Sequence, residues 1–560
     1  MPYASVSRPS VGCFFLALSS AVLLVLSFPN FNQPWCAWVA LVPWLALVRA
    51  CSSRKAWWWS YGIGAVFFLA SMWWLVHVTV IGWLLLCAYL ACYFGVFGWI
   101  AHRIVHSPQS TVHSPSVTVD GRRWTVDVSK LMVIPAAWVA LEYARSHLLS
   151  GFGWNLLGYS QTPWLALIQH ADLTGVWGVS FVIVLVNVGL AQLLDLRRGR
   201  GRVRFMLIYG MVTGGALLAL LGYGRWRLSQ VTGASTVRVA VVQGNVPQAR
   251  KWDEAFQEEI LAQYEALTEA AAATRPELII WPETAVPGFL GLDEMLTRRV
   301  LGLAQRLQRP LLVGTPTRRL AAGRFAALNS AALIDETGRP AGRYDKLRLV
   351  PFGEFIPFER WAPWLRAALP PIGDFIAGQD YTVFHIGSGE RSEVRGEREK
   401  SHTSHLTPYT SKMLAFSVLI CFEDIFPELA RRFVRDGARM LLVITNDAWF
   451  GPTAAAYQHA QASTFRAIES RVPVVRAANT GWSGCIDPAG RWVGRVQDAR
   501  GAELFVAGAH TCDVPLGAAD SLFLRWGDWF AFLCVGGCFG WVIFAIIMTT
   551  GRSRNPSPFP

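Results

Sequence analysis

LICFEDIFPE, residues 419–428, places Cys421 at the end of an apolar run and two acids within the next three positions. The longer run AFSVLICFE (415–423) is short, apolar and ends at charged residues, which is typical of a buried strand. A polar side chain at the end of a buried strand is held rigidly and can still reach a ligand. The stretch therefore predicts a strand that presents a thiol, provided that the surrounding chain forms a sheet.

The residues around this strand have the pattern of an α/β domain. Helical patterns occur at 253–273, 293–308 and 429–437. They alternate with apolar strand candidates at 237–246, 277–284, 310–316, 330–335, 415–423 and 440–447. Strands that alternate with helices predict a layered α/β domain, which we place at 236–515. Residues 388–412 are polar and unpatterned, so we expect a surface insertion there.

Apolar segments flank this block on both sides. Hydrophobic residues make up 53% of the 560 residues and charged residues only 16%. A membrane-spanning helix needs about 20 apolar residues. Eight candidate spans meet or approach this length, at about 11–28, 35–50, 57–78, 80–101, 131–147, 173–194, 205–223 and 527–549. We therefore predict a seven-span domain over 1–225 and a C-terminal transmembrane helix within 520–550.

The net charge is +13, and basic residues are concentrated in some of the loops between these spans. Basic residues lie in alternate loops: Arg49, Arg54 and Lys55, then Arg103, Arg122, Arg123 and Lys130, then five arginines in 196–204, then Arg552 and Arg554. Loops 29–34 and 148–172 carry no lysine or arginine. This positive-inside pattern predicts that both termini are cytoplasmic and that 236–515 lies on the opposite side. We expect no nucleic-acid partner, because no basic patch is interleaved with aromatic residues.

Two further polar residues join Cys421 at predicted strand ends. Glu283 follows the strand that ends in WPET, and Lys346 lies in YDKLRLVPFGE (344–354). A carboxylate can take the proton of a thiol, and a lysine can stabilise the oxyanion of a tetrahedral intermediate. Each residue alone has an ordinary interpretation: a core thiol, a turn acid and a surface lysine. Together, Glu283, Lys346 and Cys421 are a complete set for acyl transfer.

Four motifs in order make a family resemblance specific. WPET, YDKLRLVPFGE, LICFED and TNDAWFG resemble the nitrilase superfamily and its Glu-Lys-Cys triad. A nitrilase-like domain between seven spans and one span resembles the bacterial apolipoprotein N-acyltransferases. QGNVPQARKWDE (243–254) and LLGYSQTPW (156–164) are also similar to that family. The resemblance implies an α-β-β-α sandwich in the periplasm, carried by a multi-pass protein of the bacterial inner membrane.

The resemblance also implies a reaction without cofactor or metal. An acyl chain passes from a phospholipid donor through a thioester to the α-amine of a diacylated apolipoprotein, at its N-terminal S-diacylglyceryl-cysteine. Cys421 is then the nucleophile, Glu283 the general base and Lys346 the oxyanion partner. The other residues that match the family's motifs are the supporting Glu354, Glu423 and Phe422, whose backbone N–H assists Lys346, and the substrate-binding Trp252 and Trp449. Phe422 departs from members that have tyrosine after the cysteine.

Several alternatives remain open at this level. Glu354 could orient Lys346, Glu423 could cap a chain end, and both tryptophans could be core aromatics. Asn446 and Asp447 are expected to shape a turn. The same triad would also serve a membrane-tethered amidase that hydrolyses a small amide, whereas a transporter would need more ionisable residues within its spans. An oxidising compartment would allow Cys485 to pair with Cys512, but the sequence alone does not decide this.

Overall fold

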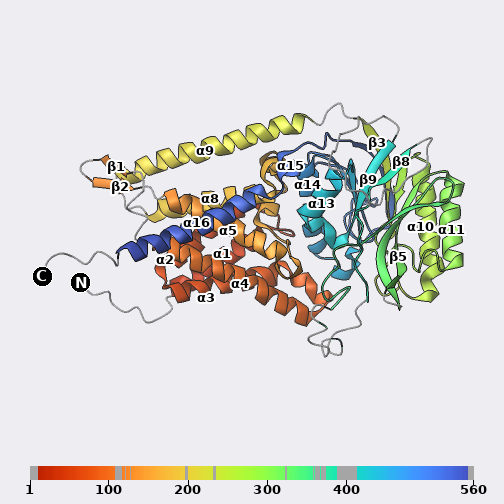
Figure 1. The fold of residues 1–560 in the computed structure, drawn as a ribbon, viewed down its shortest axis with the longest axis horizontal. Coiled ribbons are helices and arrows are strands. Elements are labelled where there is room, and N and C mark those ends of the chain that lie inside the picture. Colours follow the sequence, from red (N-terminus) through yellow and green to blue (C-terminus); the bar gives the residue numbers. More distant parts are fainter. Residues whose placement is uncertain are drawn as a thin grey trace. The chain divides into compact units, whose positions relative to one another are not determined.

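The computed structural model describes residues 11–106, 116–119, 122–125, 128–195, 200–230, 235–321, 324–356, 359, 366, 374–387 and 413–552. The whole of the predicted insertion at 388–412 lies outside this range, as does the 107–115 part of the second basic loop. The chain divides into two compact units. The helical unit contains Met1–Trp226 and Asp528–Pro560, and the unit that contains the two large sheets is Arg227–Gly527 (Figure 1).

The helical unit consists of apolar helices joined by short 3₁₀ turns. The helices with their bounds are α1 Val11–Leu26, α2 Leu41–Ala50, α3 Ser53–Ser71, α4 Val80–Val105, α5 Val128–His147, α6 Leu165–Ile168, α7 Ala171–Thr174, α8 Val176–Asp195, α9 Arg200–Ser229 and α16 Trp529–Arg552. A two-stranded hairpin, β1 Ser116–Val119 and β2 Arg122–Thr125, precedes α5. The 3₁₀ segments are η1 Pro34–Trp38, η2 Trp73–His77, η4 Leu148–Ser150 and η5 Leu157–Gln161.

Three segments of these helices are long and apolar enough to cross a bilayer: Val80–Val105, Val176–Leu194 and Leu207–Ser229. Shorter apolar helical stretches lie at Val11–Leu26, Pro34–Ala50 and Trp529–Phe544. The protein is therefore a membrane protein with several candidate spans, while the count of eight stays a prediction. The expected span at 35–50 is not one continuous helix, because η1 and α2 share it.

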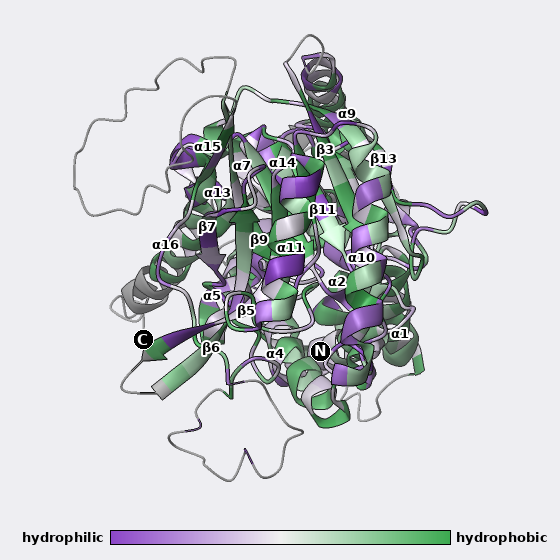
Figure 2. Cartoon of the chain, turned by 90° about the vertical axis from the view of Figure 1, so that its right-hand side faces the viewer, coloured by the Kyte–Doolittle hydropathy of each residue, from purple (hydrophilic) through white to green (hydrophobic). Residues whose placement is uncertain are grey.

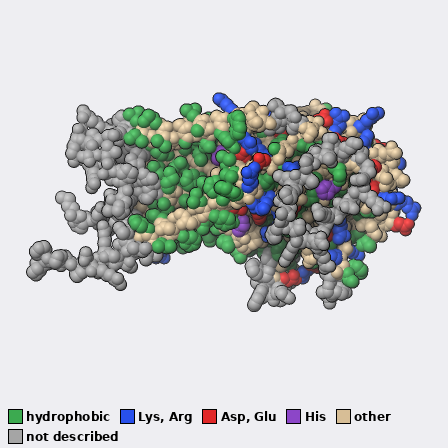
Figure 3. All heavy atoms as spheres, turned by 45° about the horizontal axis from the view of Figure 1, so that its top comes forward, with side chains coloured by type: hydrophobic (Ala, Val, Ile, Leu, Met, Phe, Trp, Pro, Cys, Tyr) green, Lys and Arg blue, Asp and Glu red, His purple; other side chains and the backbone are tan. Residues whose placement is uncertain are grey.

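The helical unit buries aromatic side chains inside and exposes apolar ones outside. Trp44 is fully buried, and its ring stacks on Phe94 at 5.0 Å and meets Trp138 edge-on at 5.8 Å. Large apolar side chains are exposed on the outer faces (green in Figure 3), among them Phe14, Phe15, Leu84, Leu85, Met211, Val212, Phe532 and Phe539. An apolar surface of this extent is unfavourable in water and favourable in lipid.

The second unit contains two six-stranded sheets. The first has the order β14-β3-β4-β5-β6-β7 and the second β13-β12-β11-β10-β9-β8. Strands β3, β4 and β5 are parallel to one another, as are β9, β10 and β11. The bounds are β3 Thr236–Gln243, β4 Leu278–Ile280, β5 Leu311–Ala321, β6 Arg324–Ile334, β7 Pro340–Asp345, β8 Phe384–Gly387, β9 Met413–Ile420, β10 Met440–Thr445, β11 Val474–Ala478, β12 Gly484–Ile486, β13 Trp492–Arg495 and β14 Gly508–Pro515.

Helices cover the outer face of each sheet. Helices α10 (Gln257–Ala272) and α11 (Glu294–Leu307) share one apolar core with β3, β4 and β5. Helices α13 (Pro427–Arg435) and α14 (Ala455–Ser470) pack on β9, β10 and β11, while the short α15 (Leu522–Trp526) contacts these two helices. The sheets contact each other through β3 with β11 and β12 with β14. This arrangement confirms the predicted α-β-β-α sandwich.

Helix α11 shows how the sequence produces this layering. Its buried residues, Leu296, Val300, Leu303 and Ala304, recur at intervals of three to four, so they form one stripe along the helix. Most of the remaining positions are polar, and hydrophilic colour appears along α10 and α11 (Figure 2). The Asp293 side chain accepts a hydrogen bond from Leu296 N at 3.1 Å and caps the first turn.

A disulfide joins the two sheets. Cys485 lies on β12 and Cys512 on β14, and the structure links their sulfur atoms. This resolves the pairing that the sequence left open. The bond closes a sequence separation of 27 residues, so it restricts the unfolded chain and ties the layers together.

Candidate active site

Cys421 stands on a strained turn at the end of β9. It is the first residue of the 3₁₀ segment η7 (Cys421–Ile425), and its φ of +54° lies in the left-handed region that non-glycine residues rarely adopt. Its side chain is buried, with 8% of the residue exposed. Strained backbone of this kind concentrates at functional sites, where surrounding contacts hold it. The predicted nucleophile therefore lies on a sharp turn between a strand and a helical segment, which presents its side chain at the carboxyl end of β9.

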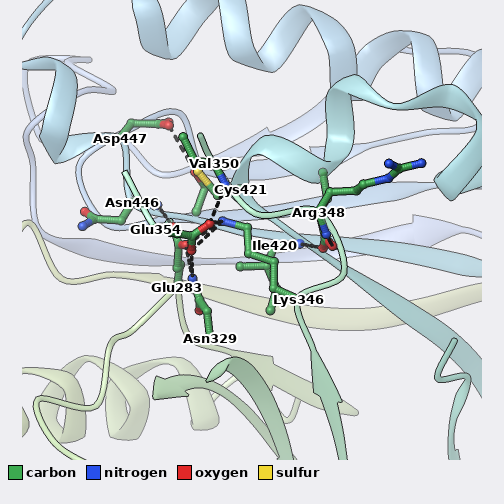
Figure 4. Close-up of polar contacts among 12 residues, drawn as sticks. Glu283, Asn329, Lys346, Arg348, Val350, Glu354, Ile420, Cys421, Asn446 and Asp447 are labelled. Carbon is green, nitrogen blue, oxygen red and sulfur yellow. Dashed lines mark hydrogen bonds and ion pairs between the residues drawn. The ribbon is translucent and has the colours of Figure 1, made fainter. Parts of the chain in front are cut away.

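Glu283 follows β4, and three groups hold its carboxylate. Asn329 Nδ2 donates to Oε1 at 2.7 Å, and the backbone N–H of Asn446 donates to Oε2 at 2.9 Å. The Lys346 ammonium lies 3.5 Å from Oε1. These donors orient the carboxylate toward the centre of the cluster, beside Cys421 (Figure 4). We name Glu283, Asn329, Lys346 and Glu354 the Glu283 cluster.

Lys346 is tied more closely to Glu354 than to Glu283. Its ammonium lies 2.9 Å from Glu354 Oε2, and the same carboxylate accepts from Val350 N at 2.8 Å and from Asn329 Nδ2 at 2.8 Å. Burial by itself would lower the pKa of Lys346, but Glu354 and Glu283 outweigh it and raise that pKa above its usual range. Lys346 therefore stays charged, and the contact with Glu354 fixes the position of its ammonium.

Cys421 rests as a thiol. Burial raises the pKa of Cys421 well above its ordinary value, and the carboxylate of Glu283 raises it further. Lys346 and a hydrogen bond with Thr445 act in the opposite direction but do not restore the ordinary pKa. A thiol in this environment needs a base in place to remove its proton as it reacts. Glu283 is the carboxylate in position to do so.

Glu423 connects the cysteine turn to the Lys346 loop. Its carboxylate accepts from Tyr344 Oη at 2.8 Å, from Ile420 N at 2.7 Å, from Leu347 N at 2.7 Å and from Arg348 N at 3.0 Å. Burial raises the pKa of Glu423 to about 7, against the effect of these donors. The side chain is fully buried and faces backbone N–H groups. This geometry matches the capping role considered from the sequence.

The three aromatic candidates occupy different environments. Phe422 is buried and meets Phe426 edge-on, with ring centroids 5.2 Å apart. Trp252 and Trp449 are each 49% exposed, so the interpretation of these tryptophans as core aromatics is wrong. Trp449 lies on the 3₁₀ turn Asp447–Phe450 that follows β10, and Trp252 adjoins the buried Lys251.

A second buried charged group, which sequence reasoning missed, adjoins Cys421. His459 bridges Asp424 and Asp447, with N–O distances of 2.9 Å to each, and Arg476 contacts the same acids at 3.0 and 3.1 Å. His459 Nε2 also lies 3.2 Å from the carbonyl oxygen of Cys421. We name these four residues the Arg476 cluster. An arginine within the apolar strand VVRAA was the available signal, because a buried charge requires partners.

The charges of the Arg476 cluster stabilise one another. Burial by itself would lower the pKa of His459, but Asp424 and Asp447 outweigh it and raise that pKa to about 9. Arg476 and His459 likewise overcome burial and lower the pKa of Asp447 to about 2. Two cations and two anions therefore face each other at neutral pH. Asp447 belongs to this network, which extends the turn-shaping role expected of it.

Lys251 is the other group that the sequence did not single out. Its ammonium donates to the carbonyl oxygen of Glu283 at 2.9 Å, and the residue is only 2% exposed. Its loop is anchored because Val246 N donates to Asn479 Oδ1 at 2.9 Å. Within the described residues, no group of three or more His, Cys, Asp or Glu side chains could hold a metal ion.

Two protein-family models match the chain, one in each unit. Residues 20–189 match the apolipoprotein N-acyltransferase N-terminal domain, and residues 238–507 match the carbon-nitrogen hydrolase domain. Among solved structures, a cysteine mutant of the Nesterenkonia AN1 amidase, from the nitrilase superfamily, aligns with a TM-score of 0.35 and 18% identity, over 52% of this chain and 94% of its own.

Relatives match along nearly the full length of the chain. The apolipoprotein N-acyltransferase of Geobacter metallireducens is 36% identical over 94% of this chain and 93% of its own. The corresponding enzyme of Chlorobaculum tepidum is 31% identical over 93% of this chain and 94% of its own. The chain, with its helical unit and its nitrilase-like sandwich, therefore belongs to the apolipoprotein N-acyltransferase family.

Proposed function

We propose that Cys421, Glu283 and Lys346 transfer an acyl chain from a membrane phospholipid to the α-amine of the N-terminal S-diacylglyceryl-cysteine of an apolipoprotein. The observation that carries this proposal is the buried Lys346–Glu283 ion pair, 3.5 Å apart, beside a cysteine on a strained strand end. These are a cation, a base and a nucleophile in one dry site. Membership of the family supplies the substrate class.

The first half of the reaction loads the enzyme. Glu283 takes the proton of the Cys421 thiol, and the sulfur attacks the carbonyl carbon of a phospholipid ester. The Lys346 ammonium and the backbone N–H of Phe422 stabilise the oxyanion that forms. The carbon–oxygen bond then breaks, and the leaving oxygen takes the proton from Glu283. The products are a lysophospholipid and an acyl thioester on Cys421.

The second half transfers the chain to the acceptor. The α-amine attacks the thioester carbon, Glu283 takes one amine proton, and the same oxyanion donors act again. The carbon–sulfur bond breaks, and the departing sulfur recovers the proton from Glu283. The product amide is more stable than the ester from which the chain came, so no nucleotide is needed. A thioester intermediate also lets two bulky lipids use the site in turn.

We propose the following arrangement in the cell. Residues 1–225 form seven spans, 236–515 form the periplasmic domain, and a last span lies within 520–550, with both termini in the cytoplasm of a bacterium. The alternating lysines and arginines support this orientation. The Cys485–Cys512 disulfide supports it independently, because such bonds persist in oxidising compartments and are rare in the cytosol.

Intact mass spectrometry tests the proposal. Purified protein mixed with phospholipid and no acceptor should gain the mass of one acyl chain. The adduct should be absent in Cys421→Ala and retained in the control Cys92→Ala, which removes an exposed free cysteine. A diacylated lipopeptide should discharge the adduct and appear as the N-acylated product.

Two other outcomes would overturn the proposal. Folded protein that forms no adduct with any phospholipid would contradict it. Protein that hydrolyses small amides while leaving the lipopeptide unmodified would favour the membrane-tethered amidase, which uses the same three residues. Adding lipopeptide and a small amide to the same sample separates these two functions directly.

A further inference from the structure

Lys251 is a buried cation for which the proposed reaction gives no role. Only 2% of the residue is exposed, and its ammonium donates to the Glu283 carbonyl oxygen at 2.9 Å. Among the described residues, this carbonyl is its one hydrogen-bond acceptor. A buried ammonium with a single neutral acceptor is costly unless nearby negative charge compensates it. The compensation must therefore come from the site itself.

The charges around the active site balance only when Lys251 is included. Glu283 and Glu354 contribute two carboxylates, and Lys346, which contacts both, contributes one ammonium. Lys251 supplies the second ammonium: it contacts the backbone of Glu283, and its charge interacts with Glu283 and Cys421. Asp447 also faces Cys421, but its charge is matched within the Arg476 cluster. Without Lys251, the Glu283 cluster would hold one uncompensated negative charge.

We propose that Lys251 is the second cation of this active site and keeps the Glu283–Cys421 pair in its singly protonated, anionic form. The inference rests on the proposed roles of Glu283 and Cys421. The pair is reactive with one proton, whether this proton sits on sulfur or on the carboxylate, and inactive with two. A nearby positive charge favours the negative charge at either position. Lys251 acts through these two residues, so it is a positioning residue.

Lys251 is itself close to titrating. Burial lowers its pKa to about 8, although Glu283 and Cys421 oppose that shift. Its charge is therefore present at neutral pH and lost as the pH rises through about 8. The Glu283–Cys421 pair binds and loses protons as a coupled unit, so loss of the Lys251 charge moves the pH at which the pair takes up its second proton.

The test uses the full-length protein and four variants. Lys251→Met removes the charge and the hydrogen bond, Lys251→Gln removes only the charge, and Lys251→Arg retains the charge. Arg250→Gln is the matched control, because it removes a positive charge from the adjacent residue, whose side chain is 53% exposed. Two rates are measured across pH: alkylation of Cys421 by iodoacetamide, located by peptide mass, and kcat/KM for acyl transfer to a lipopeptide.

The inference predicts a shift in the acidic limb of both pH profiles. Lys251→Met and Lys251→Gln should move this limb upward by about one pH unit, which lowers the rates by about tenfold at pH values below the wild-type limb. Lys251→Arg should retain the acidic limb of the wild type in both profiles, because it keeps the positive charge. Arg250→Gln should match the wild type in both profiles.

Two results would overturn the inference. If Lys251→Gln keeps the wild-type pH profiles, Lys251 only ties its loop to the Glu283 carbonyl. If Lys251→Arg loses activity as completely as Lys251→Met while its thermal melt stays unchanged, the charge is not what matters. A wild type that forms no acyl adduct would contradict the proposed function instead, while the alkylation profile would still test Lys251.

Discussion

Two buried charged clusters flank Cys421, and they are built differently. In the Arg476 cluster, four contacts of 2.9 to 3.1 Å close a ring of two acids and two bases. In the Glu283 cluster, Lys346 binds Glu354 at 2.9 Å but lies 3.5 Å from Glu283. The closed ring has no charge left for a ligand, whereas the looser pair keeps a carboxylate and an ammonium beside the thiol. We therefore expect the Arg476 cluster to hold the cysteine turn in place and the Glu283 cluster to take part in the reaction.

The largest expected effect comes from the looser cluster. Lys346→Met should lower the rate of acyl transfer by roughly 10³-fold, because it removes a preorganised charge from the oxyanion. The thermal melt should fall as well, because the substitution also breaks the buried ion pairs with Glu354 and Glu283, so the rate is compared at a temperature at which both proteins are folded. Arg348→Met is the control, since it removes a positive side chain that is 51% exposed, two residues away. Turnover is measured by acylation of a lipopeptide. Near-normal turnover of Lys346→Met would contradict the assignment of Lys346 as the oxyanion partner.

A substitution in the Arg476 cluster should lower the thermal stability of the protein. Arg476→Met removes one of the two cations that face Asp424 and Asp447, and breaking a buried ion pair costs about 3–5 kcal/mol. Thermal unfolding in detergent should show a large drop in Tm. The exposed pair Arg298–Glu294, at 79% and 85% exposure, gives the comparison, because Arg298→Met should cost less than about 1 kcal/mol. Equal losses of Tm in the two variants would show that the Arg476 cluster contributes no more to stability than an exposed ion pair.

The next largest effect is expected from removing the disulfide between the sheets. Replacing both cysteines, Cys485→Ser with Cys512→Ser, should destabilise the sandwich by about 3.5 kcal/mol, because it removes a cross-link over 27 residues. Wild-type protein melted in reductant should reproduce this loss. Acyl transfer at low temperature should persist in both samples, since neither sulfur atom belongs to the site. An unchanged melting temperature after confirmed reduction would show that packing alone holds the sheets.

The smallest expected effect is a pH dependence of stability. The pKa of His459 rises from 6.5 to about 9 on folding, so its contribution is fully present below pH 6.5 and is lost as pH rises through about 9. The loss should be on the order of 3 kcal/mol. His459→Gln should flatten the decline of Tm between these pH values. Parallel pH curves for the variant and the wild type would show that His459 is already neutral in the folded protein.

Many elements of the sandwich were predictable from local pattern. The expected helices at 253–273 and 293–308 correspond to α10 and α11, and the apolar run at 415–423 corresponds to β9 and the turn after it. The span at 35–50 was harder, because hydropathy measures composition and does not show where a helix breaks. The order of strands within each sheet was not predictable either, since β14, the last strand of the chain, pairs with β3, the first strand of this unit.

By itself, the sequence determined the α/β pattern, the apolar flanks and the motifs that carry Glu283, Lys346 and Cys421. Those features depend on neighbouring residues, so they can be read along the chain. Only the tertiary structure decided that Lys251 reaches the Glu283 carbonyl, that Glu423 caps the cysteine turn and that Arg476 meets His459 and two acids. The side chains of Glu423 and Arg476 reach residues separated from them by up to 79 and 52 positions, respectively. Each contact becomes favourable only when folding removes water and brings opposite charges together.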